Sequence, residues 1–487
     1  MKTLLLGSLL LAACGPALQA QTPPHGGGPL PDPVTWTVLA QDYNSTEREY
    51  TESVTNLLTG QITLQSHIVT EVATGLNFQD ASSGGWQASQ DLIEPTADGG
   101  AAALHGPNLV YFDPDPTADS AVKILTWSNR VFQTRVLGVY YFDSATGTGV
   151  LLAAPTNTAV AQLLPPNQLL YKGAFNSAIF KADLRFTYTK AGLESDVIIT
   201  SQPKLSPADC GLDPATTQLQ VRHQWLNAPM PRINQVIIGQ GTGTEIADQI
   251  LDFGDLSFPS GRAFAWDGGS ATDTNAPAQI ALPSALGNGT DVPVGKQWVP
   301  GPDKSTLIES AAWSSLAPKL AQLPLIAASG SGSKTRLAAA KAPAGEAPGK
   351  SSPVNRRIVV AQKAHDKLPG VVLDYIAVAP TGTNLTFNAW TPNGGVTNSD
   401  GSYVVSSSAY FIGTLTFQPN CVIKIKSNGY LLTSGGLVCN GTCSSPSVIT
   451  SYGDPMYGAD TNFDCVNYEP DVALYIWNIN TNVTISG

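Results

Sequence analysis

Alternation of apolar and polar residues with a period of two is the feature that most restricts how this chain can fold. In residues 182–188, the apolar side chains occupy one parity and the polar side chains the other. Residues 218–225 alternate in the same way, and their polar parity consists of Gln218, Gln220, Arg222 and Gln224. Because successive side chains of a strand point to opposite faces, both segments predict antiparallel strands with one face on a core and one in solvent.

Composition extends this prediction to most of the chain. Charged residues make up 13% of the 487 positions, and there are 46 Gly and 36 Pro. Globular proteins usually carry ~25% charged residues, because solvated helix faces require them. Short strands between turn signals predict a mainly β fold, with one or more β-sandwich-like domains over residues 35–325 and a subdomain from about residue 231 as an alternative. Within this region residues 244–251 suggest a helical turn, and Ser315 is a candidate N-cap for a short helix.

The C-terminal region, residues 371–487, predicts a second architecture. Its expected strands are very short, as in residues 421–425, 430–433 and 437–439, and Gly and Asn turns separate them. Such strands are typical of the successive sides of a right-handed parallel β-helix, in which each coil needs neighbouring coils. The region between the two architectures, residues 326–370, is of low complexity and carries eight basic and two acidic residues. We interpret it as a linker, with contact to acidic envelope polymers as the alternative.

The first twenty residues predict export. Lys2 precedes an apolar run at residues 4–13, which is too short to cross a bilayer because a spanning helix needs ~20 residues. Residues 11–14 match a lipobox, in which Cys14 would be lipidated, whereas the alternative is cleavage after Ala20. Residues 1–20 are therefore expected to be a signal peptide and residues 21–34 a tether. The predicted location is the outer membrane or cell surface as a lipoprotein, or the extracellular medium, with a lipid on Cys14 as the only membrane attachment.

Four of the six cysteines lie close together near the C-terminus: Cys421, Cys439, Cys443 and Cys465. An even local set in an exported protein predicts two disulfides, with three possible connectivities. A zinc site is the alternative, but only Cys439 and Cys443 have the close spacing that zinc ligands usually show. We therefore expect disulfides in this region and no metal.

Acidic residues also cluster in the C-terminal region: Asp454, Asp460, Asp464, Glu469 and Asp471. Their oxygens are weak candidates for a calcium site, because the regular spacing of a calcium-binding loop is absent. The same carboxylates could serve in glycan cleavage, which uses a pair of them. The chain contains neither His-Glu-x-x-His nor Gly-x-Ser-x-Gly, so the sequence predicts no catalytic residue and no cofactor.

Several stretches resemble a known family. Residues 126–132 (TWSNRVF), 138–143, 162–167 (QLLPPN) and 181–189 (KADLRFTYT) are similar to the N-terminal region of an uncharacterised family of large secreted bacterial proteins. In that family the region precedes β-helical or YD-repeat arrays, and residues 371–429 resemble the opening of the family's β-helix. The resemblance implies an architecture and no catalytic residues. No YD repeats occur in this chain.

These observations favour a function in binding at the cell envelope. A net charge of −11 argues against nucleic acid as a partner, since affinity for it depends on neutralising phosphates. We expect an exported, non-catalytic surface display or binding protein, with polysaccharide as the candidate ligand for exposed aromatic and amide side chains. The alternative is a carbohydrate-active enzyme, a polysaccharide lyase or a glycoside hydrolase, that uses the β-helix groove.

Overall fold

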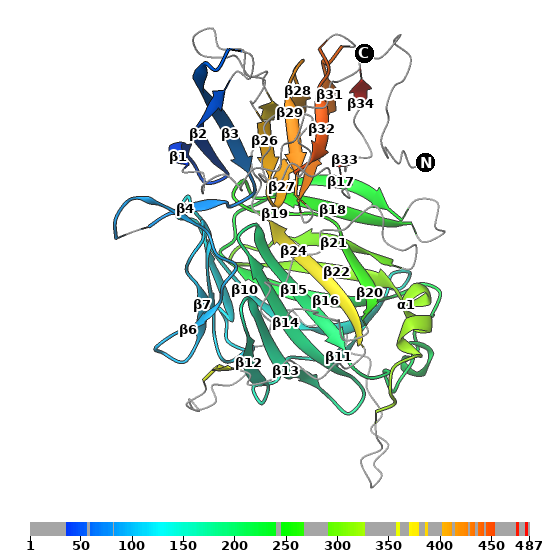
Figure 1. Cartoon of the computed structure of the whole chain (residues 1–487). Helices are drawn as coiled ribbons and strands as arrows, with labels where there is room; N and C mark the ends of the chain where they lie inside the picture. The colour runs from blue at the N-terminus through cyan, green and yellow to red at the C-terminus, as the bar shows by residue number, and fades with distance from the viewer. Residues whose placement is uncertain are drawn as a thin grey trace. The chain divides into compact units, whose positions relative to one another are not determined.

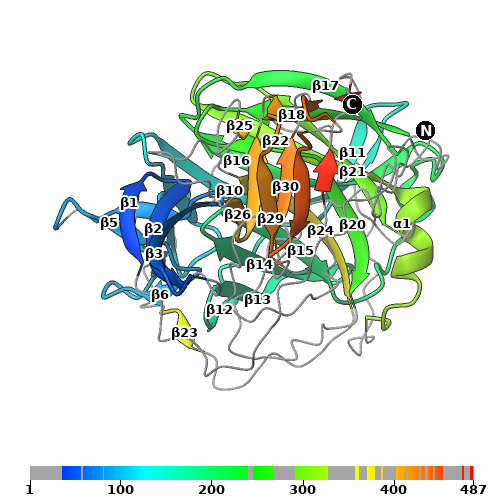
Figure 2. The ribbon, with the colours of Figure 1, turned by 45° about the horizontal axis from the view of Figure 1, so that its top comes forward.

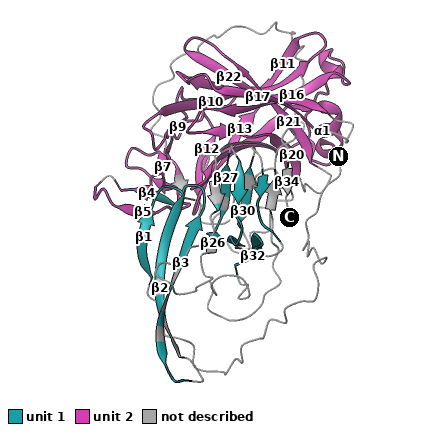
Figure 3. Cartoon of the chain, turned by 90° about the horizontal axis from the view of Figure 1, so that it is seen from above, with its two compact units in different colours: residues 1–77, 381–487 teal, residues 78–380 magenta. Residues whose placement is uncertain are grey.

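The computed structural model of this chain consists mainly of β-strands, as the sequence predicts, with one α-helix among the described residues (Figure 1). The chain divides into two compact units: residues 1–77 and 381–487 form unit 1, and residues 78–380 form unit 2 (Figure 3). The structure describes residues 36–55, 59–80, 82–239, 245–266, 291–326, 357–360, 370–378, 385–387, 402–411, 414–426, 429–433, 437–442, 445–452, 474–476 and 483–485.

The first sheet of unit 2, sheet I, is antiparallel. In spatial order it contains β6 (Glu94–Pro95), β7 (Ala101–Ala103), β8 (Leu109–Phe112), β9 (Val122–Leu125), β10 (Val131–Asp143), β16 (Thr217–Leu226), β22 (Lys304–Ala312) and β21 (Val292–Val299), with β11 (Thr148–Ala153) beside the end of β10. A bulge between Val136 and Gly138 shifts the alternation of β10 by one residue. Arg135 and Tyr140 therefore lie on the same face, although five positions separate them.

The second sheet, sheet II, is built around β24. Its strands are β23 (Val359–Val360), β12 (Val160–Leu164), β13 (Gln168–Asn176), β14 (Lys181–Thr189), β15 (Gly192–Ile199), β24 (Gly370–Val378), β20 (Gly261–Trp266), β19 (Ser257–Phe258), β18 (Ile246–Asp252) and β17 (Arg232–Ile238). β21 pairs with β20 through residues 292–294 and with β22 through residues 295–299. This shared strand joins the two sheets, so unit 2 is one nearly closed sheet rather than two separate layers.

The core of unit 2 lies between the two sheets. Its largest fully buried side chains include Phe132, Tyr141, Tyr171, Trp225 and Phe258. The core parity of residues 218–225 is confirmed, because Leu219, Val221 and Trp225 are at most 1% exposed, whereas the polar parity is only partly exposed and Gln220 is buried at 4%. Helix α1 (Trp313–Leu320) covers one end of this core with Leu316 and Leu320. It begins two residues before Ser315, with Ala312 at the N-cap, so the predicted N-cap is wrong.

Two local predictions for unit 2 are also wrong. Residues 246–252 form strand β18 and no helical turn, because the whole segment pairs with β17. The polar face of β14 and β15 is not solvated, since Asp183, Thr187, Glu194 and Asp196 are all buried. Alternation reports which residues share a face, but it does not report what covers that face. The remaining short elements are the two-stranded β4 (Asn77–Gln79) and β5 (Trp86–Ala88) and the 3₁₀ turn η1 (Ala208–Cys210).

Unit 1 combines an antiparallel meander with parallel strands. The meander contains β1 (Thr37–Gln41), β2 (Ser45–Thr55) and β3 (Ile62–Val72). β3 then pairs in parallel with β26 (Ser402–Val405), which is followed by β29 (Val422–Ile425) and β32 (Val448–Ser451) (Figures 1 and 2). Thr74, just after β3, accepts the backbone N–H of Tyr410 at 3.1 Å. The N-terminal segment therefore takes a position beside strands that follow it by more than three hundred residues.

Two further sheets of unit 1 are wholly parallel in the part of the chain described. One contains β27 (Ser408–Phe411), β30 (Tyr430–Thr433) and β33 (Leu474–Ile476); the other contains β25 (Leu385–Phe387), β28 (Leu415–Phe417), β31 (Leu437–Cys439) and β34 (Val483–Ile485). The predicted strands at residues 421–425, 430–433 and 437–439 are thus confirmed. Their inward side chains, such as Phe417, Ile423 and Leu431, form a second hydrophobic core.

Candidate functional site

Most site residues that the sequence proposes lie outside the described residues: Cys14, Cys443, Cys465, Asp454, Asp460, Asp464, Glu469 and Asp471. The structure places Cys421 and Cys439 in the core region of unit 1; Cys421 is a free thiol, and so is Cys210 in unit 2. Burial raises the pKa of Cys421 to about 11, so its thiol is protonated at neutral pH. The sequence predicts two disulfides among four cysteines with the connectivity left open; Cys421 forms none in this structure, and Cys443 and Cys465 lie outside the described residues. Sequence spacing cannot fix the sulfur-to-sulfur approach that such a bond needs.

The outer face of sheet I gathers amide, guanidinium and aromatic groups, and we call it the amide face. Its members are Arg135, Tyr140, Phe142, Gln218, Gln220, Arg222 and Gln224. The register of β10 against β16 sets Tyr140 opposite Gln220 and Phe142 opposite Gln218. Directly opposed residues of antiparallel strands point to the same side of a sheet. The face thus follows from the polar parity of β16 and from the bulge in β10.

A chain of hydrogen bonds orients the amide groups along β16. Arg222 donates from Nε and Nη2 to Oε1 of Gln220, at 3.2 and 2.9 Å. Gln220 in turn donates from Nε2 to Oε1 of Gln218 at 3.3 Å. No hydrogen bond joins Nε2 of Gln218 to another described residue, so this donor is open to a ligand. In a chain of this kind each bond polarises the next.

Arg222 also lies on an aromatic surface. Its guanidinium carbon is 4.3 Å from the ring centroid of Tyr140 and 5.7 Å from that of Phe142. Burial lowers the pKa of Arg222, and burial raises the pKa of Tyr140, so the phenol keeps its proton. The contact is a cation–π interaction, which contributes about 0.5–2 kcal/mol and fixes the guanidinium over the rings.

A second arginine completes the face. Arg135 donates from Nε to Oε1 of Gln224 at 3.2 Å, and its Nη1 atom lies 2.8 Å from the Asp119 carboxylate. Nη1 also donates to the carbonyl of Thr117 at 3.1 Å. The amide face is therefore held in place before any ligand arrives. A pre-ordered array of donors and acceptors loses less entropy when it binds, which favours affinity.

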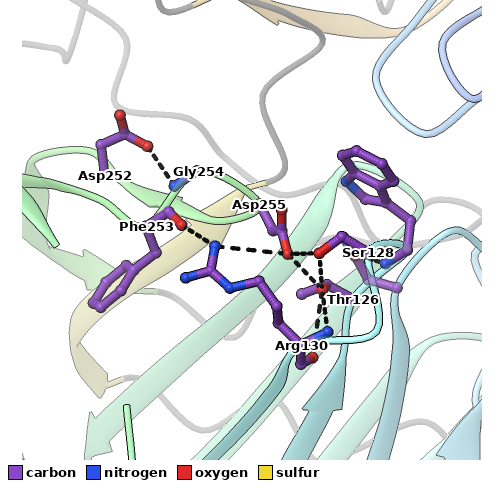
Figure 4. Close-up of polar contacts among 9 residues, drawn as sticks. Thr126, Ser128, Arg130, Asp252, Phe253, Gly254 and Asp255 are labelled. Atoms are coloured by element: carbon purple, nitrogen blue, oxygen red, sulfur yellow. Dashed lines mark hydrogen bonds and ion pairs between the residues drawn. The ribbon is translucent and has the colours of Figure 1, made fainter. Parts of the chain in front are cut away.

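A separate polar cluster fixes the turn at residues 126–130, which belongs to the TWSNRVF stretch (Figure 4). This turn joins β9 to β10 and faces the turn between β18 and β19. Thr126 donates from Oγ1 to Oδ2 of Asp255 at 2.7 Å, and Ser128 donates to the same oxygen. Arg130 donates to the carbonyl of Phe253, and its Nη1 atom lies 3.8 Å from Asp255 Oδ2. Figure 4 shows the three side chains of the first turn converging on one carboxylate oxygen.

This cluster acts as a clamp between two turns. Thr126 and Asp255 are buried, whereas Ser128 is exposed and the neighbouring Trp127 is 50% exposed. Asn129 has a positive φ of 65°, a conformation that asparagine adopts more readily than most residues. The carboxylate is occupied by structural donors and no described His adjoins it, so the geometry gives Ser128 no base to activate it as a nucleophile.

The sequence indicated the amide face only in part. The parity of Gln218, Gln220, Arg222 and Gln224 was visible, but their neighbours Tyr140 and Arg135 depend on a bulge that has no signal in the sequence. The described residues contain no group of three or more His, Cys, Asp or Glu placed to hold a metal ion. Within those same residues, no helix is long and apolar enough to cross a membrane.

Comparison with known proteins adds no assignment to this geometry. No protein-family model matches the chain, and no curated protein sequence matches it.

Proposed function

We propose that this chain is an exported, non-catalytic binding protein of the cell envelope or extracellular space, and that the amide face binds polysaccharide. The signal-like residues 1–20 and the lipobox around Cys14 support export. The observation that carries the binding proposal is the amide face itself. It combines donors and acceptors at fixed positions with aromatic rings, on the outside of a rigid sheet.

The chemistry of the amide face suits a sugar chain. Sugar hydroxyls come in neighbouring pairs that both donate and accept, and amide and guanidinium groups satisfy such pairs with fixed geometry. The C–H faces of a pyranose ring are apolar enough to pack on an aromatic ring, which gives Tyr140 and Phe142 a role beside Gln218 and Arg222. Leu151, opposite Tyr140 on β11, is 44% exposed and extends the apolar part of the face.

We further propose that unit 1 contains the first coils of a right-handed parallel β-helix. Three parallel sheets with matched register support this proposal, as does the stacking of Phe387 on Phe417 at 5.1 Å between ring centroids. Asn440, just after β31, donates a hydrogen bond at 3.3 Å to Gln418, just after the neighbouring parallel strand β28. The resemblance to secreted proteins with a β-helix agrees with this arrangement.

A glycan array tests the binding proposal, followed by calorimetric titration of the best polysaccharide. We expect Tyr140→Ala and Arg222→Ala each to weaken binding about tenfold, which corresponds to about 1.4 kcal/mol. Tyr452→Ala is the matched control, because Tyr452 also lies under a cation, with Lys426 Nζ 4.7 Å from its ring, but in unit 1. Undiminished binding by both amide-face variants would contradict the proposal. A reducing-end assay on the same polymer runs in parallel, and turnover there would favour a lyase or hydrolase instead.

A further inference from the structure

A lysine and an aspartate are completely buried against each other in unit 2. The side chains of Lys296 and Asp248 are both 0% exposed. Nζ of Lys296 lies 2.9 Å from Oδ1 and 3.1 Å from Oδ2 of Asp248, so the nitrogen is nearly equidistant from the two carboxylate oxygens. A fully buried ion pair is costly to form, because both charges lose their hydration. This position therefore calls for a chemical explanation beyond surface charge pairing.

The backbone forces this approach. Gly295 precedes Lys296 on β21, and a Cβ added there would lie 2.4 Å from the carbonyl oxygen of Ala247, the residue before Asp248. The glycine thus lets β21 and β18 run closer together than any larger residue permits. The backbone N–H of Lys296 also donates to Oδ1 of Asp248 at 2.7 Å, and Ser260 donates to Oδ2. These bonds hold the carboxyl group still while the amine faces it.

A second buried carboxylate lies opposite Lys296 on the neighbouring strand β22. Glu309 on β22 is the direct register partner of Lys296, so both side chains leave the sheet on the same face. Glu309 is 2% exposed, and its Oε2 atom lies 2.8 Å from Nε2 of His223. Its other oxygen, Oε1, is buried and has no hydrogen-bond partner. An unpaired buried carboxylate oxygen is destabilising, so it needs a reason to be there.

Aromatic rings exclude water from this region. Trp298, two residues after Lys296, packs on Phe253 at 5.3 Å and on Trp225 at 6.3 Å between ring centroids. Phe258, two residues before Ser260, packs on both Trp225 and Phe253. In such surroundings, proton transfer within the ion pair yields an uncharged amine and an uncharged acid, and burial penalises these less than it penalises the charges.

We propose that Lys296 and Asp248 join spontaneously in an isopeptide bond between β21 and β18. Nζ, once it has given up a proton, attacks Cγ of the protonated Asp248 carboxyl. The N–C bond forms, one C–O bond breaks, and the released oxygen leaves as water with two of the three ammonium protons. The third proton stays on the amide nitrogen, and both charges disappear, so no oxidant or other reactant is needed. Oε1 of Glu309 makes no ion pair with Nζ in this structure, so in this proposal the Glu309 side chain first turns toward Nζ and then carries a proton from it to the leaving oxygen.

Mass spectrometry of the denatured full chain tests the proposal directly. We expect a mass lower than that of the uncross-linked chain by one water, about 18 Da, as intramolecular condensation requires. Digestion with trypsin should leave Lys296 uncleaved and yield one branched peptide that contains both Lys296 and Asp248. Asp248→Ala and Lys296→Arg should restore the full mass. A wild-type chain of full mass, or a lost water that maps to other residues, would overturn the inference.

The role of Glu309 has its own matched control. Glu309→Gln should leave the chain at full mass, because the amide cannot accept the proton, whereas Glu309→Asp should recover part of the cross-link. Glu94→Gln is the control, since Glu94 makes the same kind of contact with His105 at 3.0 Å but on the surface. It should cross-link fully. If Glu309→Gln cross-links as fast as wild type in a refolding time course, the proton-transfer role is wrong.

Discussion

The clamp in Figure 4 yields a quantitative prediction for Asp255→Ala. The variant removes the oxygen that accepts hydrogen bonds from Thr126 and Ser128. Thr126 is 2% exposed, so its hydroxyl cannot turn to water, and its remaining acceptors, the Arg130 carbonyl and the Ser128 hydroxyl, both lie at 3.4 Å; a poorly satisfied buried hydroxyl costs about 1–3 kcal/mol. Ser128 is exposed and regains a bond to solvent, while the ion pair to Arg130, whose side chain is 39% exposed, adds less than about 1 kcal/mol. We expect the unfolding free energy to fall by about 2 kcal/mol.

Urea unfolding measures this change, and hydrogen exchange localises it. Exchange should accelerate in β9, β10, β18 and β19, which flank the two turns, and stay unchanged in unit 1. Thr126→Val removes the buried donor at nearly constant volume. The double variant with Asp255→Ala should therefore cost about 1 kcal/mol less than the sum of the single changes, because the two groups share one bond. A loss below about 0.5 kcal/mol for Asp255→Ala would show that the clamp does not stabilise these turns.

Two further predictions concern buried groups of unit 2. Burial raises the pKa of Asp196 despite its 2.7 Å contact with Arg185, so the contribution of Asp196 to stability is complete below its unfolded-state pKa and declines as pH rises through the folded-state pKa. Urea titrations between about pH 3 and pH 7 should show this decline in wild type and not in Asp196→Asn; equal slopes would contradict the assignment. Gly295→Ala should cost about 1–3 kcal/mol, because the new Cβ meets a backbone oxygen that cannot turn aside. A thermal melt of Gly295→Ala that matches wild type would show that β18 and β21 have room to separate.

Periodicity accounts for the part of the fold that the sequence predicted. The alternation at residues 218–225 correctly indicated which residues of β16 enter the core, but the opposite face is only partly exposed and Gln220 is buried. It failed at β14 and β15, where Asp183 and Asp196 are as buried as their apolar neighbours, because a polar parity is compatible with either water or protein above it. The spacing of the cysteines did not predict their pairing for a similar reason, because spacing along the chain does not say which way each side chain points.

Long-range pairing accounts for what the sequence could not predict. The register of β3 with β26 joins residue 69 to residue 402, and no local pattern marks either strand for the other. The approach of Lys296 to Asp248 likewise depends on Gly295 in a strand that belongs to both sheets. His223 pairs in the core with Glu309, at 2.8 Å between Nε2 and Oε2, across strands that are far apart in the sequence. The sequence held no sign of the pairing partner.

The place of β3 in unit 1 sets an order of events for a chain that leaves its site of synthesis N-terminus first. The meander of β1, β2 and β3 emerges early, but its parallel neighbour β26 follows only after the whole of unit 2. Until then one edge of β3 offers unpaired amide and carbonyl groups, and a three-stranded meander is only marginally stable by itself. Unit 1 must therefore complete its sheet last, after unit 2 has had time to fold.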